Sequence, residues 1–267
     1  MKNINKFIDD THTTFLDDIG KVSKDFYQKL VDYIIKYSNK GKLEYDISLS
    51  QVEDDIKKIL IESGYKSTTD NFIGSLSVIE DINIQKYQLF GLKKVIDNSE
   101  RLSLAKDIIT RNLKGIGVEQ NIIAKIADII RVQIINGSTY QELKNILHEN
   151  LVKNSISVRY VNQISVDTLT EYNGAIQADI IDNFKPKGFY YVGDLIEGSR
   201  PFCEHMKEKY GTRLITFKEL KIDLDKYCPN GIPDEKLGKG MKQGTNINNF
   251  AQYKGGHMCR HSVDLVF

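Results

Sequence analysis

The sequence is poor in proline, cysteine and net charge, and these shortages limit the class of protein. Only 4 of the 267 residues are proline, while isoleucine, leucine, lysine and glutamate are abundant, a composition that favours long helices. The net charge is +1, so the chain as a whole has no electrostatic signature of nucleic-acid or membrane-surface binding. Three cysteines are an odd number, so at least one cannot pair within the chain.

Long hydrophobic runs are also missing. No apolar run approaches the ~20 residues that a membrane-spanning helix needs, and the N-terminus lacks the apolar core of a signal peptide. We therefore expect a chain without a membrane span, made in a reducing cytoplasm where thiols stay free or bind metal. The remaining composition, 40% hydrophobic and 27% charged residues, is typical of globular proteins, and the length suits one large or two modest domains.

Apolar residues at helical spacing predict a series of helices before residue 185. The two long ones cover residues 3–38 and 155–184, and the second would be about 45 Å long at about 1.5 Å per residue. Thr139 and Glu142 form a capping box, which predicts a helix start there. Shorter helices are predicted over residues 50–64, 70–92, 101–113, 119–135 and 139–152.

The character of the chain changes after Pro186, which ends the last long helix. Pro201 suits the first position of a short helix, with Ser199 as its N-cap, and Cys203 would then lie in the first turn. The segment from Lys221 to Lys254 is predicted to be a long loop. Short strands are predicted over residues 188–192, 214–216 and 263–267.

These patterns predict a mainly α fold, with an elongated helical body and a small α+β domain at the C-terminal end. We expect three regions. They are an N-terminal helical region (1–115), a helical body (116–185) and a Cys/His-containing end domain (186–267).

Two Cys-x-His pairs in the end domain are candidate metal ligands. Cys203 and His205 follow a Ser-Arg-Pro turn, and Cys259 and His261 follow a Gly-Gly turn. Zinc prefers four nitrogen or sulfur ligands in a tetrahedron, so these four side chains could hold zinc, with His257 and Cys228 as spare ligands. Residues two apart on a helix point in different directions, which argues against His205 if this segment is helical.

Other interpretations of this cluster stay open. Cys203 and Cys259 could be small buried apolar residues, with His261 as a structural histidine, or they could form a disulfide. Cys203 could also be a nucleophile activated by a helix N-terminus and a nearby histidine. No asparagine or aspartate that would orient the histidine is recognisable by its spacing.

The remaining motif residues have a structural and a functional interpretation. Arg200 lies in the Ser-Arg-Pro turn and Arg260 follows Cys259. In the functional interpretation they contact a partner or DNA phosphate. In the structural one they form salt bridges, for example with Asp194 or Glu197. Gly255 and Gly256 indicate positive φ or a close backbone approach. No phosphate-binding glycine loop and no His-Glu-x-x-His motif occurs.

Two segments resemble the phage head morphogenesis family of minor head proteins, typified by the F protein of phage Mu. They are Ser-Arg-Pro-Phe-Cys at 199–203 and Gly-Gly-His-Met-Cys-Arg-His at 255–261. The helix over 159–183 and the Gly-Ser junction within 134–143 are also similar to the family, and the resemblance covers residues 119–267. Members often have a tryptophan before the Ser-Arg-Pro turn, where this chain has tyrosines at 190 and 191.

The resemblance implies a structural virion protein without catalytic activity. It would be made in the host cytoplasm and associate with the portal protein and with capsid or scaffold proteins at the portal vertex or capsid interior. Its implied role is in head morphogenesis, DNA packaging or ejection, with possible DNA contact. The motif residues concerned are Ser199, Arg200, Pro201, Gly255, Gly256 and Arg260.

Two other classes of function remain. The end domain could be a zinc-stabilised nucleic-acid-binding or metallonuclease module, for which Asp194, Glu204 and Asp264 are the nearest carboxylates in the sequence. The chain could also be a host-encoded helical scaffold with a zinc-stabilised end.

Overall fold

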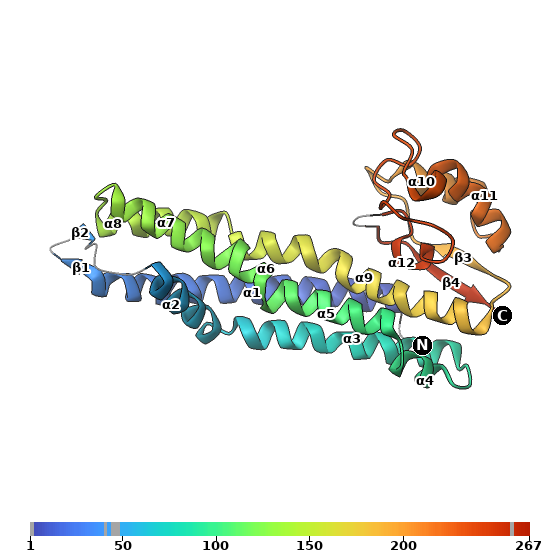
Figure 1. Ribbon diagram of the computed structural model, residues 1–267, viewed down its shortest axis with the longest axis horizontal. Coiled ribbons are helices and arrows are strands. Elements are labelled where there is room, and N and C mark those ends of the chain that lie inside the picture. Colours follow the sequence, from blue (N-terminus) through green and yellow to red (C-terminus); the bar gives the residue numbers. More distant parts are fainter. Residues whose placement is uncertain (1–2, 40–41, 44–48, 257–258) are drawn as a thin grey trace. The chain divides into compact units, whose positions relative to one another are not determined.

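The computed structural model describes residues 3–39, 42–43, 49–256 and 259–267, so His257 lies outside the described residues. The fold is mainly helical with a small α+β region near the C-terminus, as the sequence predicts (Figure 1). The predicted N-terminal helix is confirmed as α1 (Ile4–Ile34), continued by the 3-10 helix η1 (Ile35–Tyr37). Among the described residues, none of the helices combines the length and the apolar character needed to cross a bilayer.

The other predicted helices are present with shifted ends. The chain continues after η1 with a short antiparallel pair, β1 (Ser38–Asn39) and β2 (Lys42–Leu43). The capping box of Thr139 and Glu142 is confirmed at the start of α8. The helices that follow β2 are α2 (Leu49–Glu62), α3 (Tyr65–Tyr87), α4 (Leu92–Asp97), α5 (Glu100–Lys114), α6 (Ile116–Val118), the π-helical η2 (Glu119–Ile123), α7 (Ala124–Ile135), α8 (Tyr140–His148), the π-helical η3 (Glu149–Lys153) and α9 (Ile156–Phe184).

The C-terminal region contains one two-stranded antiparallel sheet. Its strands β3 (Gly188–Val192) and β4 (Ser262–Val266) are paired from Gly188–Val266 to Val192–Ser262, which confirms two of the three predicted strands. The third prediction, 214–216, was wrong, because this segment makes a single bridge, Phe189–Ile215, instead of a strand.

Helices also occupy much of the segment that was predicted to be a loop. The C-terminal half of α11 (Phe217–Tyr227), η4 (Pro229–Gly231) and α12 (Phe250–Tyr253) lie within residues 221–254. Thr216 and Glu219 form a capping box that starts α11, and the prediction overlooked this signal. Only the stretch between η4 and α12 lacks regular structure.

The chain forms two compact units, each built from separated segments. One unit consists of Asp10–Ser75 and Lys106–Ser165. Its core includes the buried stripe of Phe15, Ile19, Phe26 and Leu30 on α1, and Phe15 stacks on Phe72 of α3 with ring centroids 4.1 Å apart. The predicted domain boundaries near residues 115 and 185 stay predictions.

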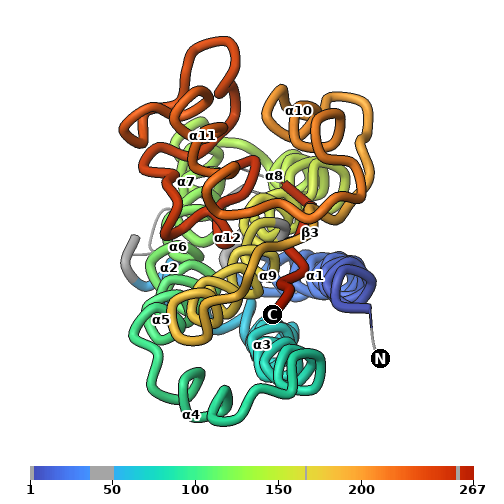
Figure 2. The backbone as a smooth tube through the Cα atoms, turned by 90° about the vertical axis from the view of Figure 1, so that its right-hand side faces the viewer, coloured from blue at the N-terminus to red at the C-terminus, as the bar shows by residue number. Residues whose placement is uncertain are grey.

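The other unit contains the sheet and both Cys-x-His pairs. It consists of the N-terminus to Asp9, Leu76–Ala105 and Val166–Phe267. The part of α9 in this unit runs through its core, since Leu169, Tyr172, Ile176 and Ile180 are at most 1% exposed. In Figures 1 and 2, β3, β4 and α12 lie beside this part of α9.

Buried polar side chains of α9 fix its neighbours. The Asn83 amide on α3 donates to Asn173 Oδ1 at 2.9 Å, and the Gln177 amide donates to the backbone oxygen of Val263 on β4 at 2.8 Å. A buried amide must find a partner or incur a desolvation penalty. These two contacts therefore set the position of α9 between α3 and the sheet.

Gly174 of α9 is expected to be intolerant of a side chain. An added Cβ would lie 2.2 Å from the backbone oxygen of Ala251 in α12, so Gly174→Ala would force the two helices apart at a cost of about 1–3 kcal/mol. Gly20→Ala in α1 is the matched control. A Cβ there meets nothing within 4 Å, and the substitution is expected to stabilise the protein by about 0.4–1 kcal/mol. Urea unfolding of both variants tests this, and an unchanged stability of Gly174→Ala would contradict it.

Candidate metal centre

The first turn of α10 positions Cys203. The helix α10 (Pro201–Tyr210) begins with Pro201 at its first position, as predicted, and Cys203 lies two residues later. The predicted N-cap was wrong. Arg200, with extended backbone, occupies that position, and the Ser199 hydroxyl accepts a hydrogen bond from the Ile196 N–H at 2.8 Å. Ser199 therefore closes the turn before the helix, and Arg200 and Pro201 start the helix.

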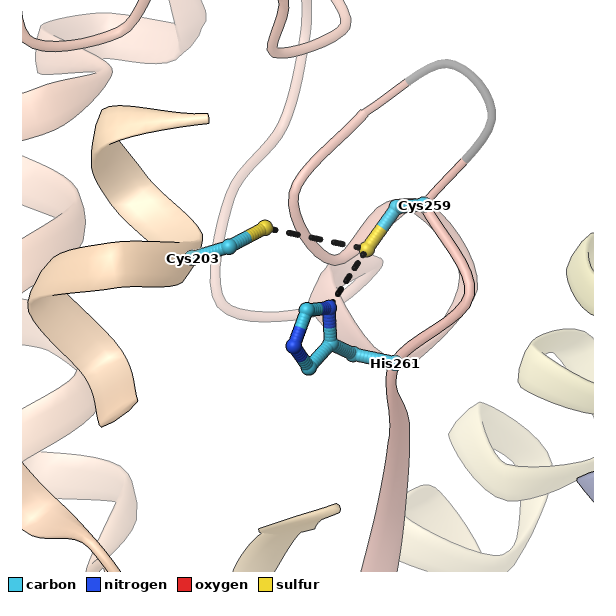
Figure 3. Close-up of side chains that lie close together, drawn as sticks. All are labelled: Cys203, Cys259 and His261. Carbon is cyan, nitrogen blue, oxygen red and sulfur yellow. Dashed lines mark hydrogen bonds between the residues drawn. The ribbon is translucent and has the colours of Figure 1, made fainter. Parts of the chain in front are cut away.

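The segment that leads into β4 positions Cys259 and His261. His261 directly precedes β4, whose first residue pairs with Val192 at the end of β3. Figure 3 shows the three side chains converging, with Cys259 between Cys203 and His261. The two sulfurs are 3.9 Å apart, and Cys259 Sγ is 3.6 Å from His261 Nδ1.

The three residues are buried and could together hold a metal ion. Cys203, Cys259 and His261 are 3%, 7% and 6% exposed, and their potential ligand atoms all lie within 4.8 Å of one another. All three cysteines of the chain are free thiols in this structure. The His261 ring nitrogen that faces Cys259 Sγ is Nδ1, and among the described residues Nε2 has no hydrogen-bond partner.

The two cysteine sulfurs lie within hydrogen-bonding distance of each other, and either thiol could be the donor. The hydrogen bond to Cys259 raises the pKa of the Cys203 thiol well above its ordinary value, and burial raises it further. The same hydrogen bond lowers the pKa of Cys259, against the effect of burial, and His261 contributes to the lowering. Thiolates are the metal-binding form of cysteine, and the lowered pKa of Cys259 favours that form. The raised pKa of Cys203 is the opposite of what a catalytic Cys203 requires.

Tyr191 is part of this cluster, although sequence reasoning did not select it as a site residue. Its hydroxyl lies 3.5 Å from Cys203 Sγ and 3.7 Å from Cys259 Sγ, and its ring stacks on His261 with centroids 4.7 Å apart and planes within 9°. Burial, with a contribution from both cysteines, raises the pKa of Tyr191 well above its ordinary value. The residue types of β3, Gly-Phe-Tyr-Tyr-Val, do not alternate between polar and apolar, so the sequence carries no signal that Tyr191 lies on the inner face.

The two glycines of the second motif allow close backbone approach, as predicted. A Cβ on Gly255 would lie 2.2 Å from Cys203 Sγ and 3.2 Å from Cys259 Sγ, so only glycine fits against the two sulfurs. Gly256 has φ of 101°, and a Cβ there would lie 1.9 Å from the backbone oxygen of Gly240. This turn brings the Cys259 segment onto α10.

Three basic residues near the cluster in the sequence differ in their contacts and in their burial. Arg200 packs on Gly240, where a Cβ would lie 2.2 Å from its Nε. Arg260 lies 3.7 Å from Asp9, which is a different carboxylate from the two suggested by the sequence, Asp194 and Glu197. Lys254 is 1% exposed, and burial lowers its pKa to about 8.

His205, the fourth predicted ligand, lies in a different contact. Its Nε2 is 2.9 Å from Asp223 Oδ1 on α11, and the structure brings together only the other three candidate ligands. Asp223 is 2% exposed and also accepts hydrogen bonds from Lys209 and Tyr210. His205 therefore helps to join α10 to α11.

Asp223→Asn is expected to destabilise the protein by about 1–3 kcal/mol near pH 7, because it weakens charge-assisted hydrogen bonds at a buried site. Burial would raise the pKa of Asp223, but hydrogen bonds from Lys209, Tyr210 and His205 lower it. The stabilisation is therefore present above the unfolded-state pKa of about 3.9 and is lost as the pH falls through the lower folded-state pKa. Urea unfolding at several pH values measures the difference, which is expected to shrink below about pH 4.

Asp225→Asn is the control, because Asp225 lies on the same helix in an exposed ion pair with Lys221. Its effect is expected to stay within about 0.5 kcal/mol. Equal effects of the two substitutions would contradict the assigned role of Asp223.

Comparisons with known proteins add no relative. No protein-family model matches the chain, no curated protein matches it, and no solved structure matches its fold. Function therefore has to be inferred from this cluster and from the two motifs that form it.

Proposed function

We propose that this chain is a structural, non-enzymatic minor head protein of a tailed bacteriophage. It would associate with the portal protein and the inner capsid during head morphogenesis and act in DNA packaging or ejection. One observation carries the proposal. The Ser199–Cys203 segment and the Gly255–His261 segment, which carry the family resemblance, supply Cys203, Gly255, Cys259 and His261 to one buried cluster.

The burial of this cluster supports a structural role. Cys203, Cys259 and His261 are each less than 10% exposed, so a substrate would have no direct access to them. A metallonuclease needs a metal that DNA can reach and carboxylates beside it. Within the described part of the chain, the candidate metal group contains no carboxylate, and Asp264 is ion-paired with Lys86.

We also propose that zinc is the metal that this group holds. Two thiolates on a tetrahedral zinc ion, at about 2.3 Å each, lie about 3.8 Å apart, and a thiolate lies about 3.6 Å from a bound imidazole nitrogen. The corresponding distances are 3.9 Å and 3.6 Å. Thiolate and imidazole ligands favour zinc over the oxygen-binding cations calcium and magnesium. The ion would link α10 to the segment before β4.

Co-sedimentation with purified portal rings tests the proposed function. We expect the wild-type chain to sediment with the rings and to leave DNA intact when a divalent metal ion is added. Arg260 is 61% exposed and lies in the second motif, so Arg260→Glu is expected to weaken the association. Arg213→Glu, at an exposed arginine outside both motifs, is the control. Metal-dependent DNA cleavage without binding to the portal rings would contradict the proposal and favour the alternative that the end domain is a metallonuclease.

A further inference from the structure

A closed tetrahedral zinc site needs a fourth ligand, and an oxygen atom lies beside both sulfurs. The Tyr191 hydroxyl is 3.5 Å from Cys203 Sγ and 3.7 Å from Cys259 Sγ. An oxygen ligand at 2.0–2.2 Å from a tetrahedral zinc ion would lie about 3.5–3.7 Å from a bound sulfur. Together with the sulfur–sulfur and sulfur–nitrogen distances, four separations among these atoms match the edges of one zinc tetrahedron.

We propose that the Tyr191 phenolate oxygen is the fourth zinc ligand, so that the centre is Cys203, Cys259, His261 and Tyr191. This inference rests on the zinc site proposed above. On metal binding, zinc would replace the protons that the cysteine sulfurs and the phenol hold, and the displaced protons would leave to solvent.

The position of Tyr191 is tightly determined. It lies on β3, paired with Val263 of β4, and it is 2% exposed. One side of its ring stacks on His261, and Phe250 of α12 lies 6.3 Å from its centroid. Because the strand and these two rings hold the side chain, its hydroxyl remains directed at the sulfurs.

The backbone of Gly255 closes the cluster on another side. A Cβ at this position would lie 2.2 Å and 3.2 Å from the two sulfurs and 3.6 Å from the Tyr191 hydroxyl. The main chain is therefore packed directly against three of the four proposed ligand atoms. Main chain that closes one side of the ligand set is the arrangement expected of a structural zinc site.

The charge of the proposed centre suits its surroundings. Lys254 is 1% exposed, and a buried ammonium group needs a negative charge nearby. Its neighbour Glu171 is itself ion-paired with Lys242. Two thiolates and one phenolate around Zn²⁺ have a net charge of −1, by +2 − 3, which balances Lys254. With a neutral phenol the centre would be uncharged and Lys254 would lack this counter-charge.

The test compares the wild-type protein with Tyr191→Phe, after removal of bound metal and reloading with Zn²⁺ or Co²⁺. Tyr190→Phe is the control, since Tyr190 is the adjacent tyrosine on the exposed face of β3. We expect Tyr191→Phe to weaken zinc affinity at least tenfold and to change the visible spectrum of the cobalt form. Metal loading should also produce tyrosinate absorption in the wild type and in Tyr190→Phe, but not in Tyr191→Phe.

The outcomes separate this inference from the zinc site itself. A wild-type protein that binds zinc without tyrosinate absorption, or with the same affinity and cobalt spectrum as Tyr191→Phe, would overturn the assignment of Tyr191 alone. A wild-type protein that binds neither metal would overturn the zinc site and the inference together. The tyrosinate signal is measured on the wild type, so it does not depend on the folding of the variant.

Discussion

Cys259→Ser is expected to abolish zinc binding and to lower the thermal stability of the chain. Cys259 Sγ lies within 3.9 Å of both Cys203 Sγ and His261 Nδ1, so its sulfur is the ligand that joins the two motifs. If zinc is present at about 100 times its dissociation constant, losing it costs about 2.7 kcal/mol. For a chain of this size the melting temperature would fall by about 5–10 °C. Metal analysis and calorimetry of the purified variant provide both measurements.

Cys228→Ser is the matched control for this prediction. Cys228 is as deeply buried, at 3% exposed, but it is not a member of the cluster. The same change of sulfur to oxygen is therefore expected to leave zinc content unchanged. If both variants retained zinc, or both lost it, the special role of Cys259 would be contradicted.

Gly255→Ala is expected to have the second-largest effect on zinc affinity and stability, because it would push the two cysteine sulfurs apart. The added methyl carbon would lie 2.2 Å from Cys203 Sγ, which is far inside van der Waals contact, so α10 and the Cys259 segment would have to separate. We expect zinc affinity to fall at least tenfold and the free energy of unfolding to fall by about 1–3 kcal/mol. Zinc titration with a competing chelator measures the affinity, and urea unfolding measures the stability.

Gly20→Ala adds the same methyl group where nothing lies within 4 Å, so it controls for the intrinsic effect of the substitution. It is expected to leave zinc affinity unchanged. Wild-type zinc affinity in Gly255→Ala would show that the glycine is not needed for the approach of the two sulfurs.

Local patterns predicted the helices well, because helical periodicity and capping boxes act over a few residues. The long helix α9 has its apolar stripe at Leu169, Tyr172, Ile176 and Ile180, and all four are buried. The loop prediction over 221–254 is confirmed for the stretch between η4 and α12, which contains Gly238, Gly240 and Gly244; it failed at α11, whose capping box was overlooked, and at α12, which has only four residues. Such a short helix has too few turns to show a pattern.

The candidate site could be predicted in part, because its residue types are distinctive. Cys203, Cys259 and His261 were selected by the metal-binding chemistry of thiol and imidazole groups, and the structure brings them together. His205 was included because it forms a Cys-x-His pair with Cys203, but a residue two positions along a helix points elsewhere, and it contacts Asp223. Tyr191 was missed because its relation to both sulfurs depends on the pairing of β3 with β4.

The most direct test of the account is metal content and free-thiol titration on the same purified sample, before and after chelation. We expect about one zinc ion per chain. Cys203 and Cys259 should resist thiol reagents until the chelator removes the metal, and unfolding should then occur at a lower temperature. A protein without metal, whose cluster thiols react equally with and without chelator, would contradict the zinc centre. The two motifs would then be held together by packing around Gly255 and Tyr191 alone.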